Sequence, residues 1–392
     1  DVRMKIGLVM PYDWSYPGGV RDHVWHLANE FQSMGHDVRV LAPASGAKGR
    51  LTEKNILKMG STTPIPINGS IARIMLDPSL VLRVRRVLQR EHFDVLHVHE
   101  PLVPGLSLAA LRCSRTLTVG TFHASSYPHL YSTSNLAYAS AYPFLRPLFR
   151  RLSGCIAVST AARQFISRYF PADYRVIPNG VNLDHFGADI APFPQYMDGK
   201  RNILFVGRFE KRKGAKYLLR AIPYIRERYP NTRFLFVGEG RLRRGFQKFV
   251  ERHGWQDVIF TGYVSDEDKH RYFASAHVFC SPATGGESMG VVLLEAMAAG
   301  TPVVASNING YNTVISPGVD GLMTTPRNSE ELAWAIGQLL EHEPLRQKFI
   351  QAGLQKSHDY AWPYVANHIL DYYYELLDER DNPSLRHISR AF

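Results

Sequence analysis

Short runs of β-branched and aliphatic residues alternate along the chain with longer segments whose apolar residues recur at helical spacing. Runs of this kind are typical of parallel strands that helices cover on both faces. The predicted strands are residues 6–9, 38–41, 95–98, 118–122 and 156–158, and then residues 203–206, 234–237, 258–260, 278–280 and 303–305. The pattern predicts an α/β protein of two doubly wound, Rossmann-like domains, with ligands at the carboxyl ends of the strands and in the interdomain cleft.

The length of 392 residues is sufficient for two domains that each bury a core. A proline-rich stretch, residues 186–199, separates the two sets of strands and predicts the linker. We therefore expect an amino-terminal domain in residues 1–185 and a second domain in residues 200–363.

Composition narrows the class of protein. A hydrophobic content of 45% and a charged content of 21% are globular values. No segment approaches the run of about 20 apolar residues that spans a bilayer, which argues against an integral membrane protein. Cys113, Cys155 and Cys280 are far apart and lie in apolar surroundings, so reduced thiols in a cytosolic protein are expected. The first strand follows residues 1–3 directly, so no secretory leader is expected.

The net charge of +11 predicts a polyanionic partner, which could be a nucleic acid, a phosphorylated ligand or an anionic lipid. Arginines gather in residues 81–90, where Arg83, Arg86 and Arg90 share one helical side and Leu80, Val84, Val87 and Leu88 share another. This basic amphipathic helix could rest on a membrane, and the candidate membrane residues are Arg83, Arg85, Arg86 and Arg90. The alternative is a packed helix with a solvated charged face.

The most informative segment contains Glu287 and Glu295, which are separated by seven residues. Residues 291–299 predict a buried helix that begins after glycines and ends at Gly300 and Pro302. The amides of Met289, Gly290 and Val291 at such a start could bind a phosphate, with one carboxylate toward a sugar and the other toward a ribose. The alternative is a solvated loop acid and a helix acid that pairs with a lysine or arginine.

Two loops after predicted strands favour a diphosphate ligand. Pro17-Gly18-Gly19-Val20 follows the first strand and opens a helix, so its backbone could approach a pyrophosphate, although such a turn can also be only a tight connection. Residues 207–214 follow the strand at 203–206 and bring Arg208 and Lys213 to its carboxyl end. Charged hydrogen bonds from such side chains contribute roughly 1.5–3 kcal/mol each, whereas a solvated basic loop would contribute nothing to binding.

Other candidate residues have plausible structural explanations. His97 and His99 point to one face of a strand but lack a third ligand at a suitable spacing, so no metal site is predicted. Residues 266–268 are acidic and precede a helical pattern whose dipole they would complement. Four tyrosines followed by three arginines could form a wall for an acceptor or a membrane, or could pack in the core; they are Tyr127, Tyr131, Tyr138, Tyr142, Arg146, Arg150 and Arg151.

Taken together, these motifs resemble those of retaining glycosyltransferases of GT-B architecture, over nearly the whole chain. The shared motifs are Pro17-Gly18-Gly19-Val20, Thr121-Phe122-His123, Ile177-Pro178-Asn179-Gly180-Val181, Gly207-Arg208 with Lys213, and the segment from Glu287 to Glu295. The chain is similar to the bacterial phosphatidylinositol mannosyltransferases in Asn68-Gly69-Ser70-Ile71-Ala72-Arg73, His97-Val98-His99-Glu100-Pro101 and Gly285-Gly286-Glu287-Ser288. In such relatives the last helix, here within residues 364–392, packs back on the first domain.

The resemblance implies a role for each matched residue. The catalytic set would be His123, Glu287, Arg208 and Lys213, and the donor-binding set would be Gly18, Gly19, Arg208, Lys213, Ser288, Met289, Gly290, Val291 and Glu295. Tyr12, Arg21, Asn68 and His123 would meet the acceptor. In place of a Gln after Gly-Gly-Val this chain has Arg21, and in place of a Lys five residues after the histidine it has Pro128, so its acceptor head group could be held differently.

The resemblance also implies the reaction, in which a hexose passes with retention from a nucleotide sugar to a lipid. GDP-mannose is the favoured donor, a UDP-sugar is possible, phosphatidylinositol is the favoured acceptor, and no metal or other cofactor is obligatory. The enzyme would be cytoplasmic and peripheral at the inner face of the plasma membrane, bound to an anionic surface and not to nucleic acid. A glycosyltransferase for another lipid or a soluble acceptor, and a nucleotide-sugar epimerase, remain alternatives. A nucleic-acid-binding protein would leave the spacing of Glu287 and Glu295 unexplained.

Overall fold

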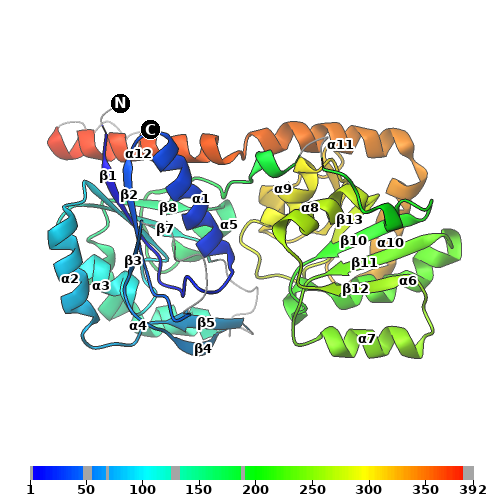
Figure 1. Ribbon diagram of the computed structural model, residues 1–392, viewed down its shortest axis with the longest axis horizontal. Coiled ribbons are helices and arrows are strands. Elements are labelled where there is room, and N and C mark those ends of the chain that lie inside the picture. The colour runs from blue at the N-terminus through cyan, green and yellow to red at the C-terminus, as the bar shows by residue number, and fades with distance from the viewer. Residues whose placement is uncertain (1–2, 47–54, 68–69, 125–132, 187–189, 383–392) are drawn as a thin grey trace. The chain divides into compact units, whose positions relative to one another are not determined.

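The computed structural model describes residues 3–46, 55–67, 70–124, 133–186 and 190–382 (Figure 1). The chain divides into two compact units. Unit 1 comprises Asp1–Asn179 and Trp362–Phe392, and unit 2 comprises Gly180–Ala361. The chain therefore enters unit 2 directly after Asn179, earlier than the predicted linker at residues 186–199.

Unit 1 is built on a parallel sheet that has seven strands among the described residues, in the order β3-β2-β1-β6-β7-β8-β9. These strands are β1 (Lys5–Val9), β2 (Asp37–Ala42), β3 (Ile56–Lys58), β6 (Val95–His99), β7 (Leu117–Phe122), β8 (Gly154–Ala157) and β9 (Tyr174–Val176). β4 (Thr63–Ile67) and β5 (Ser70–Ile74) form a separate antiparallel pair. The chain runs outward from β1 through β2 to β3 and then returns to β6 on the other side of β1, which is the doubly wound pattern.

Helices cover both faces of this sheet (Figure 1). α1 (Gly19–Ser33) and α12 (Trp362–Asp381) pack on one face, where Leu8, Phe31 and Tyr373 belong to one buried cluster. α2 (Leu80–Glu91), α3 (Leu106–Cys113), α4 (Thr133–Phe149) and α5 (Thr160–Ile166) contribute to the cluster on the other face. The hydroxyl of Tyr373 also lies 2.6 Å from Nδ1 of His97, so a polar contact fixes α12 to β6. The last helix thus belongs to unit 1, on which it was predicted to pack from the resemblance to GT-B relatives.

Unit 2 contains a second parallel sheet, with six strands in the order β12-β11-β10-β13-β14-β15 in its described part. They are β10 (Arg201–Val206), β11 (Thr232–Val237), β12 (Val258–Gly262), β13 (Val278–Ser281), β14 (Val303–Ser306) and β15 (Gly321–Thr324). The helices are α6 (Ala215–Arg228), α7 (Arg243–Arg252), α8 (Asp266–Ser275), α9 (Val291–Ala298), α10 (Ser329–Glu341) and α11 (Glu343–His358). Short 3₁₀ helices occur at Leu183–His185, Pro194–Tyr196, Lys211–Lys213 and Tyr311–Thr313.

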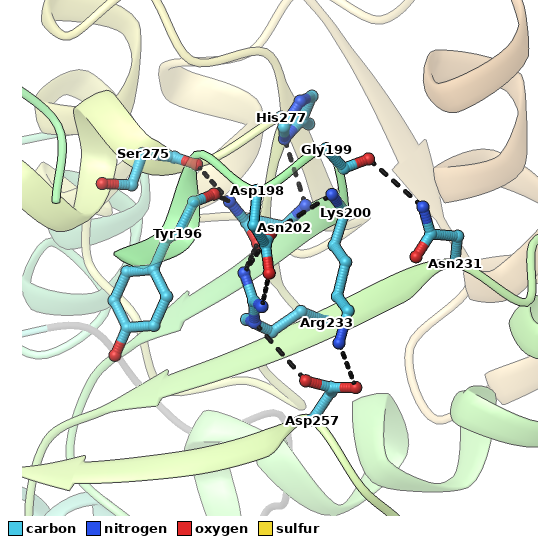
Figure 2. Close-up of polar contacts among 10 residues, drawn as sticks. All are labelled: Tyr196, Asp198, Gly199, Lys200, Asn202, Asn231, Arg233, Asp257, Ser275 and His277. Atoms are coloured by element: carbon cyan, nitrogen blue, oxygen red, sulfur yellow. Dashed lines mark hydrogen bonds and ion pairs between the residues drawn. The ribbon is translucent and has the colours of Figure 1, made fainter. Parts of the chain in front are cut away.

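The predicted linker is instead part of unit 2, because polar groups bind it to the amino-terminal end of the second sheet (Figure 2). The guanidinium of Arg233, a side chain only 6% exposed, pairs with Asp198 Oδ2 at 2.6 Å. Asn202 Nδ2 donates to the carbonyl oxygens of Tyr196 at 2.7 Å and Ser275 at 2.8 Å. Proline and glycine in this stretch therefore shape a packed segment and do not mark a free connection.

All ten predicted strands are present, with ends within two residues of the expected ones. The prediction of two doubly wound α/β domains is confirmed. No helix in the described residues is both long enough and apolar enough to cross a lipid bilayer.

Candidate functional site

Several predicted site residues in the described part of the chain follow strands at or next to the point where the strand order of each sheet reverses. In unit 1, β1 lies between β2 and β6, and the glycines follow β1 while His123 follows β7. In unit 2, β10 lies between β11 and β13, and Arg208 follows β10 while Glu287 follows β13. Loops at the carboxyl ends of strands around such a switch point are the usual ligand sites of doubly wound folds. Each unit therefore carries its own candidate subsite.

Glu287 is the centre of the subsite in unit 2. Its Oε1 lies 2.8 Å from the ammonium of Lys213 and 2.5 Å from Nη1 of Arg212. All three side chains are less than one fifth exposed, and the amide of Thr284 bonds the carbonyl of Arg212 at 2.8 Å, which joins the two loops. The alternative of a solvated loop acid is therefore wrong for Glu287.

The charge state of Glu287 follows from competing effects. Burial alone would raise the pKa of this carboxyl group, but the charges of Lys213 and Arg212 outweigh burial and hold the pKa below its ordinary value. Glu287 is therefore ionised at neutral pH. An ionised carboxylate accepts hydrogen bonds and is a weak proton acceptor, so this group is suited to orienting hydroxyl groups.

Arg208 is more accessible than the other cations of this subsite. Its side chain is 57% exposed, and its Nη1 lies 3.1 Å from Oε1 of Glu210. Glu210 also pairs with Arg212 at 3.2 Å, so three cationic side chains share two carboxylates in this subsite. The positive excess, with Arg208 facing solvent, favours an anionic ligand.

The helix α9 begins next to Glu287. Gly290 is its N-cap residue, with φ of 85° and no side chain to accept from the first turn, and a β-carbon at Gly290 would lie 2.6 Å from the ring of Tyr311. Glycine is required here both by the left-handed backbone and by this close contact. The side chain of Met289 is buried in the core, whereas Ser288 and Val291 are half-buried. The first amides of α9 lack intrahelical acceptors and carry partial positive charge toward the loop of Glu287.

Glu295 lies within α9 and is already paired. Its Oε1 accepts from the ammonium of Lys269 at 2.8 Å, and Lys269 also lies 3.3 Å from Asp266. Although burial alone would lower it, the pKa of Lys269 is raised because Glu295 and Asp266 surround the ammonium. The paired helix acid, which the sequence left as an alternative, is therefore what the structure contains. Residues 266–268 form the first turn of α8, as their predicted dipole role requires.

The glycine loop of unit 1 is open. Gly18 and Gly19 are exposed, and a β-carbon at either would meet nothing within 4 Å. Gly18 has an extended φ of 178°, so neither packing nor a left-handed backbone requires glycine at this position. Open space above the start of α1 is compatible with a closely approaching ligand.

Two of the predicted acceptor residues, Tyr12 and Arg21, lie near this loop in the sequence. Arg21 lies over the ring of Trp14 at 5.8 Å, and its buried Nε has no hydrogen-bond partner among the described residues. Tyr12 is half-buried against the core. Asn68, and the departure at Pro128, lie outside the described residues.

His123 belongs to a buried group of histidines. Its Nε2 lies 3.0 Å from Nδ1 of His99, and its backbone amide donates to Oε1 of Glu100 at 2.8 Å. Burial, together with the neighbouring histidines, lowers the pKa of His123 well below its ordinary value. Burial raises the pKa of Glu100 to about 7, against the backbone hydrogen bonds from His123 and Ala124. His123 is therefore a neutral imidazole at physiological pH.

The basic helix α2 confirms the predicted amphipathic pattern with one correction. Leu80 and Val84 are buried, whereas Arg85 and Arg86 are exposed. Arg83 is not part of the free face, because it pairs with Asp77 at 2.9 Å and donates to the carbonyl of Met59. Arg90 is exposed and pairs with Glu91 at 2.8 Å.

The tyrosine segment was expected either to face an acceptor or a membrane or to pack in the core, and its described residues include both core and exposed side chains. Tyr127 and Tyr131 lie outside the described residues, as does the side chain of Tyr138. Tyr142 packs in the core with its ring 5.4 Å from that of Phe170. Phe144 on the same helix is 79% exposed, and Arg151 donates to the carbonyl of Leu111. One tyrosine is therefore a core residue, and the exposed apolar side chain is Phe144.

Sequence reasoning missed several partners in these subsites. Arg212 was part of the basic loop, but nothing in its spacing singled it out as a partner of Glu287. Lys269 gave no signal, since it is far from Glu295 in sequence. Asn179 stands in one of the recognised motifs and could have been chosen on that ground, whereas His23, whose side chain lies 2.8 Å from that of Asn179, lies outside them.

Comparison with known proteins identifies relatives along most of the chain. Residues 17–185 match the family described as Glycosyltransferase Family 4, and residues 191–356 match Glycosyl transferases group 1. The chain is 40% identical to a phosphatidyl-myo-inositol mannosyltransferase of Mycobacterium leprae, over 94% of this chain and 96% of that protein. It is 37% identical to the protein of the same description from Mycolicibacterium smegmatis, over 94% and 93% of the two chains.

Solved structures with the same fold are more distant in sequence. Sucrose-phosphate synthase from Thermosynechococcus elongatus superposes with a TM-score of 0.76 at 20% identity, over 96% of this chain and 99% of that chain. Anabaena HepE, solved in complex with UDP-glucose, superposes with a TM-score of 0.74 at 21% identity, over 94% and 99%. At these identities the two structures establish the shared fold alone.

Proposed function

Because this chain belongs to the glycosyltransferase family of the phosphatidyl-myo-inositol mannosyltransferases, we propose that it transfers mannose from GDP-mannose to phosphatidylinositol with retention of configuration. The observation that carries this proposal is the contact of Lys213 and Arg212 with Glu287 next to the start of α9, where the N-cap residue is a glycine. This arrangement places fixed positive charge beside one ionised carboxylate. A sugar that is activated by a diphosphate needs both, because cations bind its phosphates and a carboxylate accepts hydrogen bonds from its hydroxyls.

The donor would bind to unit 2 through its diphosphate. Arg208 and Lys213 would contact the phosphate oxygens, and the first amides of α9 would donate to the same group. Fixed cations and amides stabilise the negative charge that develops on the leaving group, and they need not reorient during the reaction. Stabilisation of the departing nucleoside diphosphate would therefore be the main contribution to catalysis. No metal is needed for that charge balance.

Glu287 would orient the transferred sugar. The ion pairs with Lys213 and Arg212 both use Oε1. Oε2 would accept from a sugar hydroxyl. Glu295 would meet the ribose hydroxyls, sharing its carboxylate between them and Lys269.

The transfer itself would need no enzyme base. The acceptor hydroxyl oxygen would attack the anomeric carbon from the face that the diphosphate leaves, as the bond from that carbon to the phosphate oxygen breaks. The hydroxyl proton would pass to the departing phosphate oxygen, and the anomeric configuration would be retained. His123, as a neutral imidazole, would hold the reacting sugar or the acceptor by a hydrogen bond.

The acceptor would bind to unit 1. Tyr12, Arg21 and Asn68 would meet its head group, and the guanidinium of Arg21 supplies charge for an anionic phosphate at that point. A β-carbon at Gly18 or Gly19 would meet nothing within 4 Å, so this loop would also admit a phosphate group. Because Arg21 and Pro128 differ from the residues of the similar mannosyltransferases, another phospholipid remains an alternative acceptor.

An anionic membrane would hold the enzyme near its lipid acceptor at the inner face of the plasma membrane. Arg85 and Arg86 are exposed on α2, and Leu82 on the same helix is 54% exposed. Exposed basic and apolar side chains on one helix favour binding in the interfacial layer of a bilayer. Arg83 contributes less to this surface because Asp77 neutralises it.

Mass spectrometry of the reaction products tests the proposal. GDP-mannose and UDP-sugars are each incubated with the enzyme and vesicles that contain phosphatidylinositol or diacylglycerol. We expect a phosphatidylinositol product heavier by one hexose, formed from GDP-mannose. Transfer only to a soluble acceptor would contradict the lipid acceptor, and an altered sugar nucleotide formed without any acceptor would indicate an epimerase.

A further inference from the structure

Four buried histidines of unit 1 meet near the carboxyl end of its sheet. His23 comes from α1, His97 and His99 come from β6, and His123 follows β7. The ring centroid of His23 lies 5.1 Å from that of His99 and 4.8 Å from that of His123. The rings of His97 and His99 stack at 4.3 Å, so both side chains do point to one face, as the sequence predicted.

The hydrogen bonds divide these histidines into two kinds. His97 has no free nitrogen, since Tyr373 lies 2.6 Å from Nδ1 and Thr121 lies 2.6 Å from Nε2. His23 has a partner at Nδ1 only, the amide oxygen of Asn179 at 2.8 Å. An amide oxygen accepts, so Nδ1 of His23 carries the proton and Nε2 carries a lone pair.

Two of the remaining nitrogens are buried without a partner. Nε2 of His23 and Nε2 of His99 each lack a hydrogen bond within the described part of the chain. A buried polar atom in this state costs stability unless a ligand satisfies it. A contact from Asn179 to the opposite nitrogen is the kind of outer contact that fixes the orientation of a metal-binding histidine.

The geometry points to a transition-metal site, and we propose that His23, His99 and His123 bind one late first-row divalent cation such as Zn²⁺. One ring nitrogen from each of the three residues lies within 4.8 Å of the others. Tetrahedral zinc with bonds of about 2.0–2.1 Å places its nitrogen ligands roughly 3.3 Å apart, so a small inward turn of the rings completes the site. A water molecule or a substrate hydroxyl would take the fourth position.

The chemistry of the ligands selects the metal. Imidazole nitrogen suits zinc, copper and nickel, whereas magnesium and calcium take oxygen ligands. The contact of Nδ1 of His23 with Asn179 leaves the Nε2 lone pair of His23 available to a metal. His97 would remain outside the coordination sphere because its two hydrogen bonds occupy both nitrogens.

The expected consequence for the enzyme is inhibition. If His123 contacts the reacting sugar or acceptor, a metal ion on its nitrogen removes that contact and blocks the approach of a hydroxyl group. This consequence rests on the proposed function, whereas metal binding itself does not. Zn²⁺ would therefore slow transfer, and a chelator would restore it.

Zinc binding to the full chain tests the site directly. Isothermal titration calorimetry with Zn²⁺ should give one ion per chain, and Mg²⁺ in excess should not compete. H99N and H23N should each weaken zinc binding by more than about tenfold, as loss of a ligand requires. H26N is the matched control, because His26 lies on α1 beside His23 but stacks on Trp362, and it should retain the affinity of the wild type.

X-ray absorption at the zinc edge gives a second result that does not depend on the folding of any variant. The zinc-loaded wild type should contain imidazole ligands at about 2.0–2.1 Å. A wild-type chain that binds no zinc, an all-oxygen coordination sphere, or unchanged affinity in both H99N and H23N would overturn the site. Transfer that proceeds normally or faster with one zinc bound would overturn the inhibitory role and leave the proposed function intact. Absence of transfer both with and without zinc would contradict the proposed function alone.

Discussion

The ammonium of Lys213 lies 2.8 Å from Oε1 of Glu287, on a loop that follows a different strand of the same sheet. Arg212 approaches the same oxygen. Two cations on one carboxylate oxygen keep Glu287 ionised and hold the basic loop against the start of α9. This relationship links the proposed sugar contact to the proposed diphosphate contact within one rigid unit.

Replacement of Glu287 by Gln should impair transfer much more than folding. The amide retains the shape but not the charge that anchors Lys213 and orients a sugar hydroxyl. We expect kcat to fall by about 100-fold, the usual effect of losing one well-placed polar group, as measured by initial rates of transfer. E341Q, which breaks an exposed pair with Arg228 in the same unit, should leave the rate unchanged. Equal rates for E287Q and the wild type would remove Glu287 from the site.

Replacement of Glu295 by Gln should affect donor binding more than chemistry. Glu295 is assigned to the ribose, so its loss should raise KM for the donor by about tenfold, equivalent to roughly 1.4 kcal/mol, with a small change in kcat. K269M is the companion variant, because it frees Glu295 from its partner and should destabilise the unit by leaving a carboxylate partly buried. A large fall in kcat at unchanged KM in E295Q would contradict the ribose role.

The arginines of α2 should separate into two functional classes. R85E with R86E should weaken binding to vesicles that contain anionic lipid by tenfold or more, since each basic residue near such a surface contributes about 1 kcal/mol. R83E should instead lower the melting temperature, because Arg83 is held by Asp77 and Met59. Vesicle flotation and thermal unfolding measure the two effects. Equal partitioning with and without anionic lipid would remove the membrane surface.

The sequence was sufficient for the two sheets because their central strands are buried on both faces and read as continuous apolar runs. β3, β9 and β15 were not predicted, because each is a short edge strand that lacks such a run, and the separate pair β4 and β5 was not predicted either. The linker was misassigned because proline and glycine mark irregular backbone whether or not it is packed. Here Arg233, distant in sequence, binds Asp198 and makes the segment part of unit 2.

The candidate site was predictable only in part. Lys213 and Glu287 stand in recognisable loops after strands, so topology alone brings them to one edge of the sheet. Arg212 and Lys269 could not be assigned as partners in this way. Their contacts with Glu287 and Glu295 depend on the direction in which each side chain points, and sequence spacing does not determine that direction for residues far apart in the chain. The convergence of His23 with His99 and His123 depends in the same way on the packing of α1 against the sheet.

The stability of unit 2 should depend on pH through His277. Nδ1 of His277 accepts from the amide of Asn202 at 3.0 Å, and burial, with the nearby charges of Arg201 and Arg346, lowers its pKa to about 4 (Figure 2). Because the unfolded histidine binds a proton at about pH 6.5 and the folded one does not, its stabilising effect is complete above pH 6.5 and is lost toward pH 4.

H277N should therefore lose less stability than the wild type between pH 7.5 and pH 4.5, as measured by denaturant unfolding. The asparagine oxygen can still accept from the amide of Asn202, so the hydrogen bond is retained in the comparison. H253N, at an exposed position of the same unit, should follow the wild type. Parallel pH profiles for H277N and the wild type would contradict the assignment.

In the proposed donor site, unit 2 binds the second phosphate of a nucleotide through Arg208, Lys213 and the start of α9. The most direct measurement compares the affinities of GDP and GMP, and of UDP and UMP, for the full chain and for K213M by isothermal titration calorimetry. For the preferred base we predict that the second phosphate strengthens binding to the wild type by at least about tenfold, and that K213M loses most of this gain. Equal affinities for the monophosphate and the diphosphate, or a gain that persists in K213M, would contradict the account.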